Sequence, residues 1–316
     1  MPTYTVKSSG GDYTSLSAAE AARNGNHVSA AAITTIECYG FTDTTAVTIN
    51  GGTSNSSYYF EVITTGDGVH SGKWTSGAYI LNVTATIAVN SQDDYVRIRG
   101  LQLEMSRSSD SSNLIALLTQ AGHNQTINRV ILRRTGTNPG LAGFFNNACN
   151  DCVFSNCLAY DFSTGADGSG FRFAGGTGTV IYNCGVHNCY EGYRSTAGIQ
   201  TSYNCWNQNA SSAGWSLNWT GDYNLTDEAS AGNMPGANSV ANASLTFADE
   251  ANDDFHLVAG DTAAIGAAFD YSGVFTDDID GDTRSSWDIG PDEYISSGSV
   301  VSIARTNYLT LMSVGP

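Results

Sequence analysis

Three short segments between residues 149 and 209 end in the same two residues, and this repeat constrains the fold more than any other feature. The pairs are Asn156-Cys157, Asn183-Cys184 and Asn204-Cys205, spaced 27 and 21 residues apart. Each pair closes a strand-like run and is followed by a polar, glycine-rich return. A period of roughly 20–30 residues with strands and no helical pattern is typical of a solenoid of strands.

Stacking of the repeats explains why these residue types recur. One coil cannot bury its apolar face alone, whereas stacked coils place like side chains in ladders about 4.8 Å apart. Asn at a turn can bond the Asn above and below it, and a small apolar Cys can fill the interior beside it. We therefore predict an all-β chain, a single-stranded right-handed parallel β-helix.

The chain divides into four predicted parts. Residues 1–30 hold a strand and a short helix, since Ser17-x-x-Glu20 is a capping box followed by an alanine-rich run, and this helix would cover the open end of the first coil. Residues 31–220 form the β-helix body, with roughly seven to nine coils of about 20–28 residues. Residues 221–295 are a loop-rich closing segment, and residues 296–316 are an apolar tail for docking or oligomerisation.

The composition of the chain limits the kinds of molecule that it is expected to bind. The net charge of −17 repels nucleic acid and anionic membranes, and it would repel acidic polysaccharides unless a cation bridged them. No apolar run is long enough to span a bilayer, and the N-terminus lacks the pattern of a signal peptide, so we expect neither membrane insertion nor a leader. Only Lys7 and Lys73 are lysines, which partly disfavours a lyase with a lysine base.

The seven cysteines leave three alternatives open. Cys149-x-x-Cys152 with Cys157 could bind zinc, although no second pair stands at the spacing of a zinc finger. Disulfides are the second alternative. Stacked reduced thiols are the interpretation we favour, because free cysteine is among the most buried residue types.

Three stretches resemble a known group of proteins. They are residues 11–16 (GDYTSL), 222–225 (DYNL) and 277–294 (DDIDGDTRSSWDIGPDEY). They are similar to segments of right-handed parallel β-helix proteins of bacteria and their phages, and the similarity covers about residues 3–294. The resemblance implies the same fold. The group is functionally mixed, so the resemblance carries over no catalytic residue.

The closing segment contains a candidate calcium site. Asp278, Asp280 and Asp282 alternate, and oxygen-rich loops of this kind can hold calcium. The match to an EF-hand fails, because the glycine comes too early and Ile289 stands in place of the bidentate Glu. The alternative is a carboxylate cluster that pairs with Arg284 and bonds turn amides.

Carboxylates beside the coil returns are candidate catalytic groups. Glycoside hydrolysis needs two carboxylates about 5–10 Å apart across a groove, and neighbouring coils could meet that distance. The best-placed acids are Asp161, Asp167, Glu191 and Asp222, with Arg172 and Arg194 as clamps for a sugar or a carboxylate. Acids in turns are also common for local backbone bonding.

Aromatic residues crowd the last coils and supply candidate ligand contacts. Trp206, Trp215 and Trp219 are predicted to be the more open of these, since aromatic faces stack on sugar rings. Tyr182 and Tyr203 repeat in register, and we expect them in an interior stack or a subunit interface. The five histidines have no Ser or Cys partner at a recognisable spacing and no glycine-rich phosphate loop opens a helix, which disfavours nucleophilic and nucleotide chemistry.

The predicted function is structural. We expect a surface protein of a phage virion, such as a tail spike, fibre, appendage or head decoration, that forms a rigid rod and binds host glycans. We expect a homotrimer that contacts other virion proteins through residues 296–316. We expect it to need no cofactor, with calcium as the one candidate ion. A polysaccharide-degrading hydrolase or lyase acting along the β-helix face is the alternative, and a bacterial surface adhesin is the second alternative.

Overall fold

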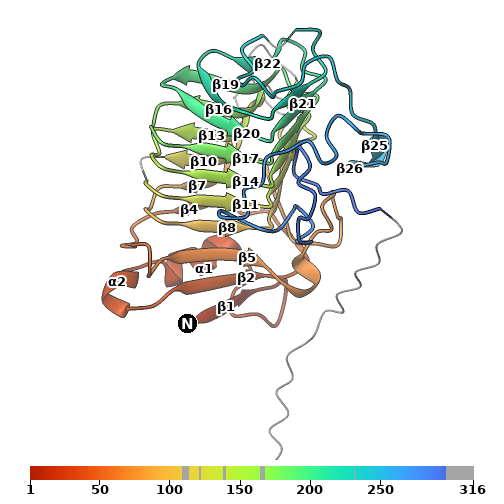
Figure 1. Cartoon of the computed structure of the whole chain (residues 1–316). Helices are drawn as coiled ribbons and strands as arrows, with labels where there is room; N and C mark the ends of the chain where they lie inside the picture. The colour runs from red at the N-terminus through yellow and green to blue at the C-terminus, as the bar shows by residue number, and fades with distance from the viewer. Residues whose placement is uncertain (109–113, 121, 138–139, 164–167, 231, 297–316) are drawn as a thin grey trace, which may run out of the picture.

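The computed structural model describes residues 1–108, 114–120, 122–137, 140–163, 168–230 and 232–296. It confirms the right-handed parallel β-helix predicted from the repeat. Three parallel sheets run the length of the stack, and each coil contributes one short strand to each sheet in turn (Figure 1). None of the helices in this described part of the chain has the length and apolar character needed to cross a membrane.

The first sheet is entered first in every coil and has nine strands. They are β1 (Thr3–Val6), β2 (Thr34–Cys38), β5 (Phe60–Thr64), β8 (Arg97–Arg99), β11 (Thr126–Asn128), β14 (Val153–Ser155), β17 (Val180–Tyr182), β20 (Gln200–Tyr203) and β23 (Trp219–Asp222). From β2 onward, eight of these described strands each begin a coil, within the predicted seven to nine. The coil that begins at β5 is longer than predicted, because it carries the short 3-10 helix η1 (Gly66–Gly68) and its loop.

The second and third sheets complete each coil. The second sheet contains β3 (Thr42–Asp43), β6 (Ile80–Val83), β9 (Gln102–Met105), β12 (Ile131–Arg134), β15 (Leu158–Tyr160), β18 (Gly185–His187), β21 (Trp206–Gln208) and β24 (Leu225–Thr226). The third sheet contains β4 (Val47–Ile49), β7 (Ile87–Ser91), β10 (Leu114–Gln120), β13 (Gly140–Asn147), β16 (Ser169–Ala174), β19 (Glu191–Ala197) and β22 (Ala213–Ser216).

A two-residue corner joins the first sheet to the second in six successive coils, and its first residue always has a positive φ. We call these first residues the corner column. They are Gly100, Arg129, Asn156, Asn183, Asn204 and Tyr223, with φ of 79°, 56°, 52°, 45°, 55° and 57°. Asn is the side chain that tolerates this left-handed conformation best after Gly. The backbone geometry of the corner therefore explains why Asn recurs there.

The predicted Asn and Cys ladders are confirmed. The strands on both sides of the corner pair in register, so Asn156, Asn183 and Asn204 lie one above the other. The side-chain Nδ2 of Asn204 donates to Oδ1 of Asn183 at 3.0 Å. Asn156 differs from the expectation, because its amide bonds the closing segment instead of a neighbouring Asn.

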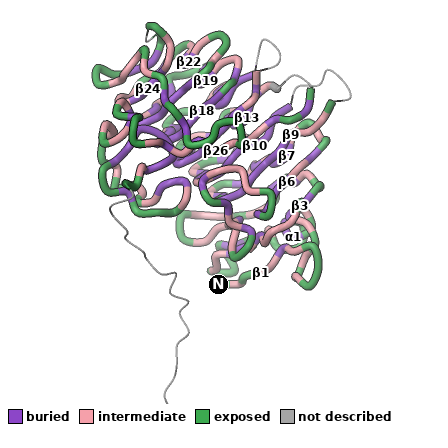
Figure 2. The backbone as a smooth tube through the Cα atoms, turned by 90° about the vertical axis from the view of Figure 1, so that its right-hand side faces the viewer, coloured by how far each residue is buried: buried purple, intermediate pink, exposed green. Residues whose placement is uncertain are grey.

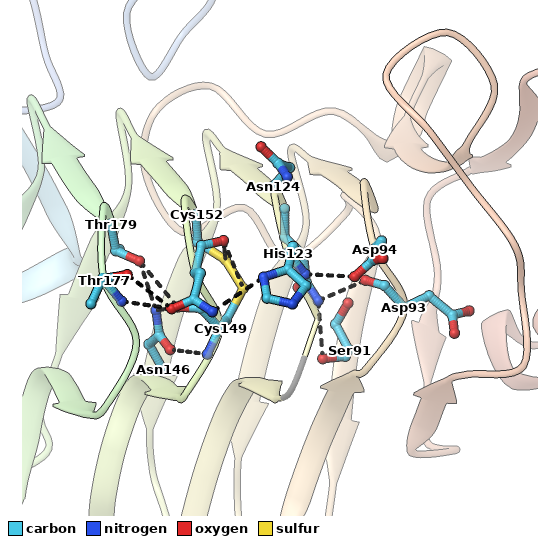
Figure 3. Close-up of a disulfide and its surroundings, with 12 residues drawn as sticks. Ser91, Asp93, Asp94, His123, Asn124, Asn146, Cys149, Cys152, Thr177 and Thr179 are labelled. Atoms are coloured by element: carbon cyan, nitrogen blue, oxygen red, sulfur yellow. Dashed lines mark hydrogen bonds between the residues drawn. A yellow bond between two sulfur atoms is a disulfide. The ribbon is translucent and has the colours of Figure 1, made fainter.

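The cysteines follow two of the three alternatives, the stacked thiols and the disulfide. Cys157, Cys184 and Cys205 are free and fully buried next to the corner column, as predicted for stacked thiols. Cys149 and Cys152 instead form a disulfide, so neither sulfur is available for the zinc site considered from the sequence (Figure 3). Asn146 accepts from the backbone N–H of Cys149 at 2.9 Å, which fixes the turn that brings the two sulfurs together.

Aromatic rings fill the interior against the third sheet. Phe144, Phe171, Tyr193 and Trp215 occupy equivalent positions on β13, β16, β19 and β22. Successive ring centroids are 4.5, 5.3 and 4.6 Å apart, with interplanar angles of 13°, 13° and 17°. Figure 2 shows buried positions, in purple, recurring along the backbone from coil to coil. Offset-stacked rings at such distances add favourable contact energy to the burial of their area.

The N-terminal helix α1 (Leu16–Arg23) lies at the base of the stack, next to β1, β2 and β4, and a second short helix, α2 (His27–Ala30), follows it (Figure 1). Leu16 and Ala19 of α1 are fully buried in the core that the coils share, so α1 covers the first coil as predicted. The predicted cap is wrong by two residues. Ser15 caps the helix by accepting from Ala18 N, while Glu20 accepts from Asn50 N.

The closing segment returns along the outside of the stack (Figure 1). It contains β25 (Phe247–Asp249), the 3-10 helix η2 (Glu250–Asn252) and β26 (Asp254–Leu257), and β25 pairs with β26 in an antiparallel hairpin. Its apolar residues make a second core with the outer face of the second sheet. The second sheet is therefore covered on both faces.

Candidate functional site

The three described catalytic candidates occupy different corners and sheets. Asp161 follows β15 with a φ of 68°, and its carboxylate accepts from Asn188 Nδ2 at 2.6 Å. Glu191 begins β19 in the third sheet, and Asp222 ends β23 in the first sheet. Asp167 lies outside the described residues.

Local bonding explains two of these acids. Asp222 accepts from the backbone N–H groups of Tyr223 and Asn238. Asp161 bonds Asn188, and burial raises the pKa of its carboxyl group. Asp161 and Asn188 directly follow the equivalent strands β15 and β18 in successive coils, and both have a positive φ. Together with their hydrogen bond, this makes them a structural ladder. Asp222 thus follows the alternative weighed from the sequence, in which an acid in a turn bonds the local backbone.

Arg172 and Arg194 lie one above the other on the third sheet, as β16 and β19 pair in register. They alternate with the interior rings of Phe171 and Tyr193 and therefore belong to the outer face. Arg194 Nη1 is 2.9 Å from Glu191 Oε2. The two predicted clamps are thus neighbours, and one of them already pairs with a carboxylate.

The three tryptophans are not open, and the expectation that they offer ligand contacts is wrong. Trp206 and Trp215 are each 1% exposed and Trp219 is 9% exposed. Trp215 and Trp219 pack against Tyr193 inside the β-helix. Trp206 lies on the outer face of the second sheet, where Phe247 and the backbone of Gly290 in the closing segment cover it.

A groove of about 490 Å³ opens on the outer face of the first sheet, where the closing segment lies against it. Its residues come from β8, β11, β14 and one loop of the closing segment. They are Arg99, Thr126, Asn128, Val153, Ser155, Val274, Phe275, Thr276 and Asp277. Asn128 Nδ2 donates to Ser155 Oγ at 2.9 Å, so two polar groups of the floor are held in place by each other.

Aromatic rings continue the same column beyond the groove. Tyr182 and Tyr203 are the next residues in register after Ser155, and their rings stack with centroids 5.7 Å apart. Tyr271 and Phe275 of the closing segment pack against Tyr182, at 4.8 and 6.0 Å between centroids. We call these four rings the aromatic platform. All four are partly exposed, so the interior position expected for Tyr182 and Tyr203 is wrong, while the alternative of a subunit interface stays a prediction.

The electrostatics of the platform favour neutral phenols. Burial, and then the neighbouring Tyr203, raise the pKa of Tyr182. Burial, followed by Tyr203 and Tyr182, likewise raises the pKa of Tyr271. The phenols of Tyr182 and Tyr271 therefore stay uncharged at ordinary pH, and each presents both an apolar face and a hydroxyl group.

A buried arginine holds the closing segment on the corner column. The side chain of Arg284 has no exposed surface. Its Nη2 donates to Asn156 Oδ1 at 2.9 Å and to the carbonyls of Gly290 and Pro291 at 2.9 and 2.7 Å. Asn204 exchanges two hydrogen bonds with the backbone of Phe269. The corner column therefore bonds the segment that walls the groove.

The three predicted calcium ligands, Asp278, Asp280 and Asp282, do not point to one common site. Oδ1 of Asp278 accepts from the backbone N–H groups of Asp280, Gly281 and Asp282, and its Oδ2 accepts from Glu293 N. Burial, and then the charge of Asp280, raise the pKa of Asp278 to about 7. Asp278 thus bonds turn amides, which is the alternative weighed from the sequence. Asp280 and Asp282 instead line a separate hollow.

Comparisons with known proteins show the fold. No protein-family model and no curated protein matches the chain. A rhamnogalacturonan lyase matches 78% of this chain and 75% of its own, with 12% identity and a TM-score of 0.52. A pectin methylesterase from Aspergillus niger matches 86% of this chain and 93% of its own, with 14% identity and a TM-score of 0.47. The chain is similar to the lyase in its β-helix architecture.

The sequence analysis missed the groove, although part of it can be found by aligning the corners. Arg99, Asn128, Ser155, Tyr182 and Tyr203 each directly precede a corner residue, so they share one outward column. The wall contributed by residues 274–277 has no such signal. It depends on how an irregular segment folds back.

Proposed function

We propose that this protein binds a neutral polysaccharide chain along the outer face of the first sheet and does not cleave it. The observation that carries the proposal is the aromatic platform beside the groove. Binding sites for small molecules and sugars are concave surfaces that combine apolar and aromatic area with a few fixed polar groups. The groove and the platform supply both on one face.

The arrangement suits a polymer because it repeats along the stack. A sugar ring offers an apolar C–H face to an aromatic ring and hydroxyl groups to polar side chains. Tyr182 and Tyr203 provide rings on successive coils, while Asn128, Ser155 and Thr126 provide hydrogen-bonding groups on the coils before them. The contacts recur at the strand spacing of about 4.8 Å.

Charge and composition of the groove support binding without cleavage. Among the nine residues that line it, Asp277 is the single carboxylate. Hydrolysis of a glycosidic bond uses two carboxylates on opposite sides of the bond. The net charge of −17 disfavours an acidic chain, which supports a neutral one.

The test is a binding panel with the full chain. Neutral glycans are compared with acidic ones, including rhamnogalacturonan and pectin, which the names of the structural neighbours suggest. We expect calorimetry or an array to show binding to a neutral glycan and weaker binding to acidic ones. Binding to acidic chains alone would contradict the proposal.

Two tryptophan substitutions locate the site. Thr126→Trp places a large ring in the groove and should abolish binding. Thr220 occupies the same outward column as Thr126, four coils further along. Thr220→Trp is therefore the matched control, and we expect it to leave glycan binding unchanged. Equal binding by both variants would place the glycan elsewhere.

Product analysis separates binding from catalysis. We expect no new reducing ends and no unsaturated sugars after prolonged incubation with the bound glycan. Release that stops in Asp161→Asn or Glu191→Gln would overturn the non-catalytic proposal and favour the enzyme.

The location on a phage virion and the homotrimer stay predictions. The tail predicted to contact other virion proteins is residues 296–316, of which 297–316 lie outside the described part of the chain. Light scattering of the intact chain and of a chain ending at residue 296 would measure the predicted trimer and its dependence on the tail.

A further inference from the structure

Three side chains with metal-ligating atoms meet where the closing segment crosses the second sheet. His256 belongs to β26, and Asp280 and Asp292 belong to the loops that follow it. One ligand atom from each of the three lies within 4.8 Å of the other two. Nε2 of His256 is 3.0 Å from Oδ2 of Asp280. Asp292 is only 6% exposed, so its carboxylate is held inside the fold.

A carboxylate on the far side of the imidazole fixes which nitrogen faces the cluster. Oδ1 of Asp254 accepts from Nδ1 of His256, and Lys73 Nζ lies 2.6 Å from the other oxygen of Asp254. Histidines that bind metal ions usually donate their second N–H to such a carboxylate, which orients the ring and leaves the other nitrogen for the ion.

Space for an ion is left on one side of the cluster, and Gly72 closes the other side. A hollow of about 230 Å³, lined in part by His256, Asp280 and Asp292, opens the cluster to solvent. On the other side stands Gly72, with a φ of +68°. A Cβ atom at position 72 would lie 2.4 Å from His256 Nε2 and 2.5 Å from Asp280 Oδ1. A side chain there would clash with the same two ligand atoms, so a glycine is what lets the loop approach the cluster this closely.

We propose that His256, Asp280 and Asp292 bind one divalent transition-metal ion, with zinc preferred over calcium. Imidazole nitrogen with carboxylate oxygen is a ligand set that zinc accepts, whereas calcium takes six to eight oxygens. Three protein ligands leave a fourth position open toward the hollow. The ion joins β26 to the loops of residues 280 and 292, and this role is independent of glycan binding.

This site differs from the one predicted from the sequence. The two share Asp280, while Asp278 is occupied by turn amides and Asp282 only lines the hollow. The decisive ligand is His256, which stands 24 residues before Asp280 in the chain. Because His256 adds a nitrogen ligand, the proposed site suits a transition metal, whereas the oxygen-only site predicted from the sequence suits calcium.

The test uses the full chain after dialysis against a chelator. Titration calorimetry with zinc chloride should show one site, and calcium chloride should bind much more weakly or not at all. His256→Gln and Asp280→Asn should each weaken zinc binding by about 100-fold or more, and Asp254→Asn by about 10- to 100-fold. Asp282→Asn, which changes an acid of the same hollow, is the matched control and should leave zinc affinity unchanged.

A second measurement needs no variant. Cobalt(II) added to the wild-type chain should give visible absorption bands of a low-coordinate site with a nitrogen ligand, and zinc should displace them. The proposal is overturned if zinc does not bind, if His256→Gln and Asp280→Asn bind it as well as the wild type, or if calcium binds more tightly. In the first two cases His256 only pairs with Asp254 and Asp280 and holds no metal, whereas tighter calcium binding would assign the ion to oxygen ligands.

Discussion

The β-helix body and the closing segment are held together by different forces. In the body, each coil repeats the same contacts, and the apolar interior runs without interruption from α1 to the last coil. In the closing segment, the apolar contacts with the second sheet do not repeat, and a few buried polar groups hold the loops in place, with Arg284 and the carboxylates of Asp278, Asp288 and Glu293 at the centre. The comparison teaches that a repeat spreads stability over many positions, whereas an irregular segment concentrates it in few.

The largest expected effect is in the body. Phe171→Ala removes a ring that stacks between Phe144 and Tyr193 and should lower the free energy of unfolding by about 4 kcal/mol. Urea denaturation should show the whole chain unfolding earlier. The control is Phe269→Ala, which removes a ring that is 49% exposed and should cost far less. Equal losses would mean that the interior stack is not the source of stability.

A slightly smaller effect is expected at the centre of the closing segment. Arg284→Met leaves the oxygen of Asn156 and the carbonyls of Gly290 and Pro291 without their donor, which should cost about 3 kcal/mol. Hydrogen exchange should accelerate in residues 265–294 while the coils keep their protection. Arg99→Ala, at an exposed position, is the control. If hydrogen exchange accelerated equally in the coils, the claim that the body and the closing segment are stabilised separately would be contradicted.

The contact between the two regions can be weakened at one residue. Asn204→Gly keeps the positive φ but removes the bonds to Phe269 and Asn183, and should cost about 2 kcal/mol. Asn242→Gly, at an exposed position with a φ of 58°, should change stability by less than about 0.5 kcal/mol. Thermal unfolding of both variants measures the difference. No difference would show that the corner column does not anchor the segment.

The smallest effect is expected from the disulfide. Replacing Cys149 and Cys152 together by Ser should lower stability by about 1 kcal/mol, since the disulfide closes a very short loop. A reducing agent should destabilise the wild type by a similar amount and leave the double variant unaffected. Sensitivity of the double variant to the reducing agent would assign the effect to another pair of thiols.

The sequence predicts the body well because its constraints repeat. Asn recurs at three successive corners that need a left-handed residue, and Cys recurs beside it where the interior needs a small apolar one. Gly100, Arg129 and Tyr223 occupy the same column but share no residue type, so the pattern fades toward both ends. The α1 cap was misplaced because Ser15 and Ser17 both precede the helix interior, and only the fold shows that Glu20 bonds Asn50 instead.

The candidate site could be predicted only in part. The polar floor of the groove follows from the corner alignment, whereas its wall and the platform rings Tyr271 and Phe275 depend on the path of the closing segment. Trp206 was expected to be open for the same reason, because nothing in its coil shows that Phe247 covers it. His256 and Asp280 meet through irregular loops, which have no period to align.

The groove exists only when the closing segment lies on the first sheet. The most direct test therefore asks whether releasing the closing segment abolishes glycan binding. Binding of the neutral glycan selected from the panel is measured for wild type and for Arg284→Met, with hydrogen exchange recording the release of residues 265–294. The account predicts that the variant keeps its coils and loses the glycan. Unchanged glycan affinity with the segment released would contradict it.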